Sequence, residues 1–171
     1  MSTVVLSIGS NLGDRLAHLQ SVVDGLRDAV LAVSPVYETD AWGGVEQGPF
    51  LNAVLLADDP ARDARDWLQL AHEFEDAAQR VREQHWGPRT LDVDIVSCRD
   101  SHGEVRSDDP TLTLPHPFAH QRAFVLAPWL AAAPDAELTL DGRSQPVAQL
   151  LCALDPAERD GVRLSELSLV H

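Results

Sequence analysis

The sequence predicts an α+β fold in which helices pack against an antiparallel sheet. Two long segments carry apolar residues at helical spacing, and several shorter segments are apolar or alternate with period two. They follow one another as strand, helix, two strands, helix and strand. This is the order of a ferredoxin-like domain, so we expect that arrangement, with both helices on one face of the sheet. A chain of 171 residues fits a single domain.

The first strand and helix are predicted by the opening thirty residues. Residues 4–8 are apolar and predict a buried strand, and Gly9-Ser10-Asn11 predicts a turn in which Asn11 caps a helix. The glycines at 9 and 13 also suit a phosphate at the helix start, although neither a P-loop nor a Rossmann glycine pattern is present. Spacings of three and four predict the helix itself, through Leu12, Leu16, Leu19, Val23, Leu26 and Val30.

Three further strands and a second helix complete the expected core. We expect the strands at residues 33–39, 50–57 and 91–97, and Asp59-Pro60 predicts the start of the helix before the last of them. The glycine-rich connection 40–49 predicts a mobile binding loop. Residues 99–110 predict a polar hairpin or loop. The buried stripe of the second helix is expected to comprise Ala64, Trp67, Leu68, Ala71, Phe74 and Ala78.

The end of the chain carries weaker signals. Asp141-Gly142 predicts a hairpin, residues 147–154 a short helix, and the remainder a polar tail.

Composition excludes several classes of protein. The formal net charge of −14 argues against nucleic acid or an anionic membrane as partner. The chain has no lysine, which excludes Walker-A kinases, protein kinases and Schiff-base chemistry. Cys98 and Cys152 form no disulfide framework, so a reduced, cytoplasmic protein is expected. No apolar run reaches the ~20 residues of a membrane helix, and no signal peptide is visible.

The strongest functional signal lies at residues 80–95. Alternation at 91–95 turns the apolar side chains toward a core and Asp92 and Asp94 toward the opposite face. Two carboxylates on one strand face suit Mg²⁺, which completes its coordination with water and phosphate oxygens. A strand without metal and a solvated arginine face are the ordinary alternatives. In an acidic chain, the combination favours a metal–nucleotide, because phosphate-binding guanidinium groups directly precede the carboxylates, at Arg80, Arg82 and Arg89.

These residues resemble the signature of a known family. The motif R-V-R-x(3)-W-G-P-R-T-L-D-V-D-I at 80–95 is similar to that of the 6-hydroxymethyl-7,8-dihydropterin pyrophosphokinases of folate biosynthesis. Other blocks of the family follow in order: L-S-I-G-S-N-L-G-D-R at 6–15, V-Y-E-T at 36–39, F-L-N-A-V at 50–54, and L-P-H-P with R-A-F-V-L-x-P between 114 and 128. The resemblance covers most of residues 3–130, which leaves 134–171 as an elaboration of the same domain.

The resemblance implies transfer of pyrophosphate from ATP to the hydroxymethyl group of the dihydropterin, with release of AMP. Catalysis would then rest on Arg80, Arg82, Arg89, Asp92 and Asp94, the two carboxylates holding Mg²⁺, as two ions. Contacts to ATP are expected from Glu75, Arg82, Arg89, Ile95, Thr113, His116 and Arg122. The pterin pocket, over which the connection 40–49 would close, is expected from Thr39, Trp42, Phe50, Asn52, Trp86 and Phe124.

Each of these residues also has an ordinary structural role open to it. Asn52 matches the N–C–N edge of a pterin but is equally compatible with a satisfied structural amide. Aromatic residues are more often core, Glu75 suits a solvated helix face, and a lone histidine beside proline, such as His116, is most often structural. At the level of function, a non-catalytic binding module and a two-metal phosphohydrolase are the alternatives. A monomer is expected.

Two positions depart from familiar members of the family. The connection before Trp86 is short and has Glu83, Gln84 and His85 where some relatives carry lysine and arginine. Thr111 stands where some relatives have another arginine. Which arginine contacts which phosphate therefore stays open.

Overall fold

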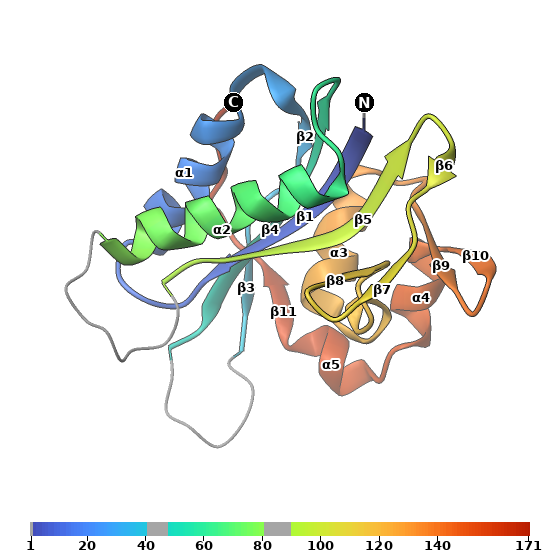
Figure 1. Cartoon of the computed structure of the whole chain (residues 1–171). Helices are drawn as coiled ribbons and strands as arrows, with labels where there is room; N and C mark the ends of the chain where they lie inside the picture. Colours follow the sequence, from blue (N-terminus) through green and yellow to red (C-terminus); the bar gives the residue numbers. More distant parts are fainter. Residues whose placement is uncertain (1, 41–47, 81–89) are drawn as a thin grey trace.

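The structure, a computed structural model, describes residues 2–40, 48–80 and 90–171. Within these residues a seven-stranded antiparallel sheet forms the centre of the molecule (Figure 1). Its strands run in the order β11-β3-β4-β1-β5-β6, and β2 pairs with β4 beside β3. The long strands are β1 (Ser2–Ser10), β4 (Phe50–Asp59) and β5 (Asp92–Asp100). The short strands are β2 (Val30–Val33), β3 (Tyr37–Thr39), β6 (Gly103–Glu104) and β11 (Val162–Leu164).

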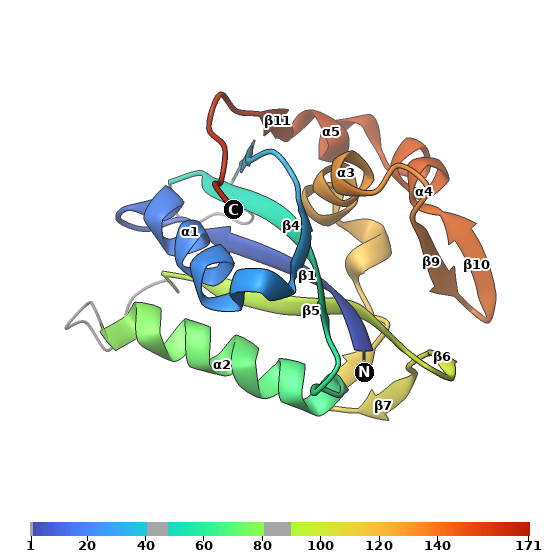
Figure 2. The same cartoon turned by 90° about the horizontal axis from the view of Figure 1, so that it is seen from above.

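Helices cover both faces of this sheet (Figure 2). The two predicted helices, α1 (Arg15–Leu26) and α2 (Ala64–Arg80), lie on one face, as expected. The other face is covered by α3 (Ala123–Ala132), which is followed by α4 (Val147–Ala153) and α5 (Pro156–Asp160). Short 3-10 turns precede β2 and α3, at η1 (Arg27–Ala29) and η2 (Ala119–Gln121). The α+β fold is therefore confirmed and extended by a third layer.

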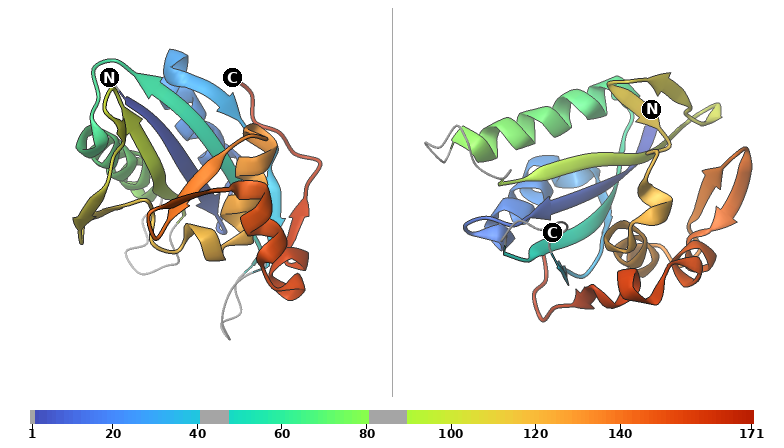
Figure 3. Two further views of the ribbon diagram at one scale, coloured as in Figure 1. Left: turned by 90° about the vertical axis from the view of Figure 1, so that its right-hand side faces the viewer. Right: turned by 90° about the horizontal axis from the view of Figure 1, so that it is seen from below.

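Two hairpins lie outside the main sheet (Figure 3). The first pairs β7 (Ser107–Asp109) with β8 (Leu112–Leu114) and follows the small hairpin that β5 makes with β6. The second pairs β9 (Glu137–Leu140) with β10 (Arg143–Pro146). Its turn has positive φ at both Asp141 (50°) and Gly142 (78°), the geometry that suits the twist of a hairpin. The hairpin and the short helix predicted after residue 134 are both confirmed.

Side-chain alternation along the central strands divides the core in two. Val4, Leu6 and Ile8 of β1 pack in the cluster beneath α1 and α2, whereas Val5 packs with Trp129 of α3. Residues in phase with Val5 therefore face α3 on every strand of the central sheet. In β1 this phase carries Val5 and then, toward the end of the strand, Ser7 and Gly9, where the candidate site lies.

Both predicted helix caps were placed too early. The side chain of Asp14, rather than that of Asn11, caps α1 by accepting a hydrogen bond from the Ala17 N–H at 3.1 Å. The α2 helix begins after Asp63, which exchanges two hydrogen bonds of 2.9 Å with Asp66 in a reciprocal cap. These carboxylates satisfy N–H groups that have no partner inside the helix. In both cases a later acidic residue took the capping position.

Other differences concern the strands and the polar tail. The strand predicted at 33–39 is divided into β2 and β3 around Pro35, which has no N–H to donate to a strand ladder. The tail predicted to be merely polar contains α5 and β11, and β11 extends the main sheet by pairing with β3. The helix α3 was not predicted. No helix among the described residues is long and apolar enough to cross a membrane.

Candidate active site

Strand register brings the polar residues of three neighbouring strands together. Gly9 of β1 lies opposite Asn52 of β4 on one side and Asp92 of β5 on the other. In the next row, Ser7 lies between Val54 and Asp94. All these positions are in phase with Val5 and therefore face the α3 side of the sheet. The predicted carboxylate pair thus shares one face, and it lies across Gly9 from the predicted pterin amide.

A cavity of about 510 Å³ opens on this face, within the size range of small-molecule sites. Part of its wall comes from the sheet and from Asp40 directly after β3: Ser7, Gly9, Thr39, Asp40, Phe50, Asn52, Asp92 and Asp94. The remainder comes from the segment around the start of α3: Phe118, Gln121, Arg122 and Phe124. The cavity therefore brings together four residues predicted for the pterin, both predicted metal ligands and one residue predicted for the nucleotide, Arg122.

The amide of Asn52 lies at one end of this cavity, with only 5% of the residue exposed. Its Nδ2 lies directly over Gly9, where an added Cβ would come within 2.6 Å of it. Among the described residues its Oδ1 has no hydrogen-bond partner, and neither has the buried Oγ1 of Thr39. Buried polar atoms without partners are unfavourable, so these two atoms mark a place for a polar ligand. The alternative of a satisfied structural amide finds no support among the described residues, because none of them pairs with this oxygen.

The two carboxylates of β5 are held by contacts on both sides of the strand. Asp92 and Asp94 are half-buried, and Val93 between them points into the opposite core. The Val93 N–H donates to Oε2 of Glu75 on α2 at 3.1 Å. Glu75 therefore fixes the backbone between the two aspartates, and it is half-buried rather than on a solvated helix face.

An arginine between two aromatic rings contributes to the other wall. The guanidinium carbon of Arg122 lies 5.7 Å from the ring centroid of Phe118 and 5.6 Å from that of Phe124, distances typical of cation–π contacts. Phe118 is otherwise 52% exposed. These contacts place the guanidinium group beside both rings at the cavity wall.

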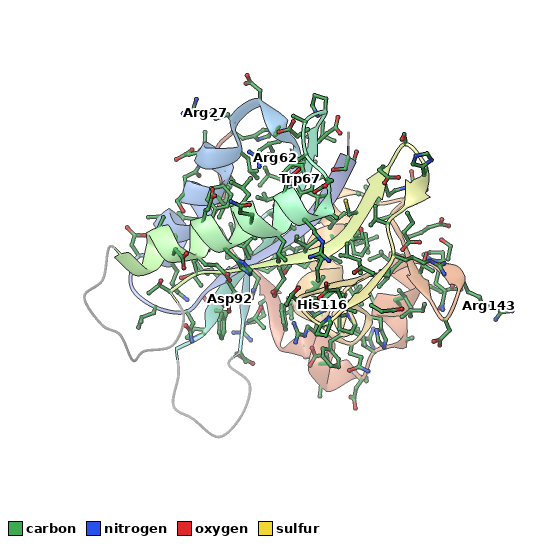
Figure 4. The ribbon with its side chains drawn as sticks, in the orientation of Figure 1. Arg27, Arg62, Trp67, Asp92, His116 and Arg143 are labelled. Atoms are coloured by element: carbon green, nitrogen blue, oxygen red, sulfur yellow. The ribbon has the colours of Figure 1, made fainter. Side chains whose placement is uncertain are left out.

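His116 lies beside this wall, and Figure 4 labels it together with Asp92. Its Nδ1 accepts a hydrogen bond from the Phe118 N–H at 3.2 Å, so the neutral ring carries its proton on Nε2. Burial lowers the pKa of His116, and the charge of Arg122 acts in the same direction while that of Asp94 opposes it. The imidazole is therefore a neutral donor through Nε2 near pH 7.

Not every predicted residue reaches the cavity. The Ile95 side chain is buried in the core beneath the helices, on the opposite face of β5. Thr113 donates from its hydroxyl to the Asp109 carbonyl at 3.0 Å and is absent from the cavity wall. The predictions for Trp42, Arg82, Trp86 and Arg89 lie outside the described residues, as does the side chain of Arg80.

Some cavity residues had not been predicted as ligand contacts. Ser7 is a polar residue in the phase of β1 that faces the cavity, so the period-two pattern could have indicated it. The sequence places Gly9 in a turn before the first helix, but Gly9 lies within β1. Asp40, Phe118 and Gln121 reach the cavity through the paths of their connections, which no local pattern in the sequence specifies.

Fold and cavity define an α+β domain with a small-molecule cavity on one face of its sheet, lined by polar, acidic and aromatic side chains. The family model for 7,8-dihydro-6-hydroxymethylpterin-pyrophosphokinase (HPPK) matches residues 5–134. The chain belongs to this family.

Curated relatives extend the similarity over nearly the whole chain. The 2-amino-4-hydroxy-6-hydroxymethyldihydropteridine pyrophosphokinase of Mycobacterium tuberculosis (strain ATCC 25618 / H37Rv) is 60% identical over 169 residues, covering 96% of this chain and 90% of that protein. Its counterpart in Mycobacterium leprae is 61% identical over 175 residues, with coverages of 99% and 92%. The Pseudomonas aeruginosa protein of that name is 38% identical over 162 residues, with coverages of 91% and 95%.

Solved structures agree in fold. Plasmodium falciparum HPPK-DHPS, wild type with pterin and p-hydroxybenzoate, matches with a TM-score of 0.61 at 11% identity, over 88% of this chain and 42% of that chain. Another HPPK-DHPS structure, in complex with substrates, has a TM-score of 0.61 at 9% identity, with coverages of 89% and 44%. The chain spans less than half the length of these solved chains. At such low identity the likeness concerns the fold, which it confirms.

Proposed function

We propose that this protein transfers pyrophosphate from ATP to the hydroxymethyl group of 6-hydroxymethyl-7,8-dihydropterin, giving the pterin diphosphate and AMP, in folate biosynthesis. Family membership and the pyrophosphokinases that are 60% and 61% identical support this activity. The structural observation that carries it is a single cavity in which the Asn52 oxygen, unpaired among the described residues, lies across Gly9 from Asp92. Such a cavity can hold both substrates side by side.

The pterin would occupy the end of the cavity formed by Asn52 and Thr39. An amide offers one acceptor and two donors, which match the alternating N–H and nitrogen positions on the edge of a pterin. Phe50 and Phe124 line the same cavity and offer ring faces on which a flat heterocycle can stack. A ligand placed in this way would pair the two buried oxygen atoms that lack partners among the described residues.

The metal–nucleotide would occupy the end formed by Asp92 and Asp94. The described residues contain no group of three or more His, Cys, Asp or Glu that could enclose a metal by themselves. A pair of half-buried carboxylates nevertheless fits Mg²⁺, which takes one or two protein carboxylates and fills its other positions with water and phosphate oxygens. We propose two such ions, whose charge would offset that of the phosphates.

Transfer requires the pterin hydroxymethyl oxygen to bond to the β-phosphorus and lose its proton, while the bond from that phosphorus to the oxygen of AMP breaks and AMP leaves. The cavity would align the two substrates for this displacement. His116 would donate through Nε2 to a phosphate oxygen, and Arg122 would add its fixed positive charge. On the basis of the family motif, we assign the remaining charge stabilisation to Arg80, Arg82 and Arg89.

The cellular compartment and the oligomeric state are also proposals. Cys98 and Cys152 are both free thiols, which is compatible with a reducing cytoplasm. We propose that the protein acts there as a monomer, and light scattering at assay concentration would detect any larger assembly.

The test is AMP release from ATP and Mg²⁺, measured with and without the pterin. We expect AMP only when the pterin is present, and almost none from Asp92→Ala. The matched control is Asp108→Ala, because Asp108 is exposed on β7 and is absent from the cavity wall. Binding of both substrates without AMP would indicate a binding module instead. Phosphate released without pterin would indicate a phosphohydrolase.

A further inference from the structure

Residues 155–164, which we call the C-terminal strap, contact two separate walls of the cavity. They follow the part of the chain that the family model matches, which ends at residue 134. The C-terminal strap consists of α5 and β11, with the Asp155 cap before α5 and Gly161 between them. In Figures 2 and 3 it runs from α4 past α3 to the edge of the sheet at β3.

The first contact is with β3, the strand that carries Thr39. Val162 pairs with Thr39 in the strand register, and the Asp40 N–H donates to the Gly161 carbonyl at 3.0 Å. Arg163 adds a hydrogen bond from Nη2 to Asp40 Oδ1 at 2.9 Å and lies 3.6 Å from Glu38 Oε1. The strand β3 has only three residues, and it pairs with β4 on one side and with β11 on the other. Thr39 and Asp40, which both line the cavity, are thus held from outside it.

The second contact is with the first residue of α3. The N-cap residue, Arg122, makes no side-chain capping hydrogen bond, so the helix start depends on another residue. Oε1 of Glu158 accepts from the Ala123 N–H at 3.2 Å, across 35 residues of sequence. A carboxylate at this end of a helix is also favoured by the helix dipole. Ala123 is fully buried and lies between Arg122 and Phe124, which both line the cavity.

We propose that the C-terminal strap positions the pterin-binding walls, with Arg163 holding Thr39 and Asp40 and Glu158 holding the turn that presents Arg122 and Phe124. Both are positioning residues, because neither lines the cavity. The inference rests on the proposed function, since it takes the cavity to be the pterin site. It extends that function by assigning a role to a segment outside the matched family region.

The experiment uses the full chain and measures the Kd of the pterin by calorimetry, with Mg²⁺ and α,β-methylene ATP present. This analogue blocks the bond that breaks in the reaction, so binding is measured without turnover. The variants are Arg163→Ala, Glu158→Ala and Glu158→Gln, and thermal melting checks that each is folded. The matched control is Arg143→Ala, because Arg143 lies on the exposed β9–β10 hairpin and projects from the rim of the molecule in Figure 4.

For Arg163→Ala we expect the pterin Kd to rise about two- to fivefold, the range available to an exposed ion pair. The Kd of the ATP analogue should stay at the wild-type value, because the contacts of Arg163 end at Glu38 and Asp40. Glu158→Ala should raise the pterin Kd about threefold or more, because removing a capping carboxylate destabilises the start of α3, which presents Arg122 and Phe124. Glu158→Gln should restore most of this affinity, since its amide oxygen can still accept from the Ala123 N–H.

Three results would overturn the inference. The first is a pterin Kd in Arg163→Ala equal to that of Arg143→Ala, and the second is equal weakening of both ligands, which indicates general destabilisation. The third is a Glu158→Gln protein as weak as Glu158→Ala. A wild type that binds pterin but forms no AMP contradicts the proposed activity alone, and the Kd values still decide the role of the C-terminal strap. A wild type that binds no pterin overturns both.

Discussion

Replacing Gly9 by alanine should weaken pterin binding without unfolding the protein. The new Cβ would stand 2.6 Å from Asn52 Nδ2, and ordinary contact begins at 3.4 Å, so the amide must move by about 0.8 Å, the difference between these distances. Gly9 lies within β1, where an alanine backbone is unstrained, and the next atom that the Cβ would meet, the Leu51 carbonyl oxygen, is at 3.7 Å. The clash is therefore confined to the end of one side chain.

The magnitude follows from the bonds that the displaced amide can no longer make. Two hydrogen bonds from the ligand to the amide contribute about 0.5–1.5 kcal/mol each. Their loss corresponds to a pterin affinity about 5- to 150-fold lower. The assay is calorimetric titration of the pterin with Mg²⁺ and α,β-methylene ATP present. The Kd of the analogue, titrated separately, should change much less.

A double-mutant cycle tests whether Gly9→Ala acts through Asn52. In an Asn52→Ala background the new methyl group has no amide to displace, so adding Gly9→Ala should weaken pterin binding no further. If the two substitutions instead reduce affinity independently, with effects that add, the link between the missing Cβ and the amide position is refuted.

Three further predictions concern catalysis, pH and stability. Arg89→Ala should lower kcat about 10³-fold or more with little change in substrate KM, as measured by initial rates. Hydrogen bonds from Arg65 and Thr111 lower the pKa of Asp109 to about 2, so its stabilising contribution is complete above its ordinary pKa near 4 and is lost as pH falls through 2. NMR titration of Arg65→Met should show this pKa raised toward 3.8. Trp67→Ala should lower the free energy of unfolding by about 3–5 kcal/mol in urea titration, because Trp67 is 1% exposed and donates to Ser2 Oγ.

The main sheet and its first two helices could be predicted because their patterns are local and long. The apolar run of β1, the alternation on β5 and the helical spacing on α1 and α2 are each visible within one segment, and their apolar side chains are buried. The helix α3 could not be predicted in this way. Its sequence, AFVLAPWLAA, is apolar all round because the helix is largely buried, so no amphipathic pattern separates it from a strand. The short elements α5 and β11 have too few residues to show any period.

The site residues show the same difference between local patterns, which could be predicted, and contacts between distant segments, which could not. Asp92 and Asp94 were predicted because both lie on one strand, where period two fixes their common face. The contact of Asn52 with Gly9 depends on the register between two strands more than forty residues apart in the chain, which the sequence does not specify. The same holds for Glu158, whose contact with α3 spans 35 residues. Such contacts depend on how distant segments of the chain pack together, and no local pattern in the sequence specifies that packing.

The central claim is that one cavity holds the pterin at Asn52 and a magnesium nucleotide at Asp92 and Asp94. A crystal structure with Mg²⁺, α,β-methylene ATP and the pterin tests it most directly. We predict magnesium bound to both carboxylates, and the pterin edge hydrogen-bonded to the Asn52 amide, with its hydroxymethyl group directed toward the β-phosphorus. Either ligand bound outside this cavity, or magnesium without contact to Asp92 and Asp94, would contradict the claim.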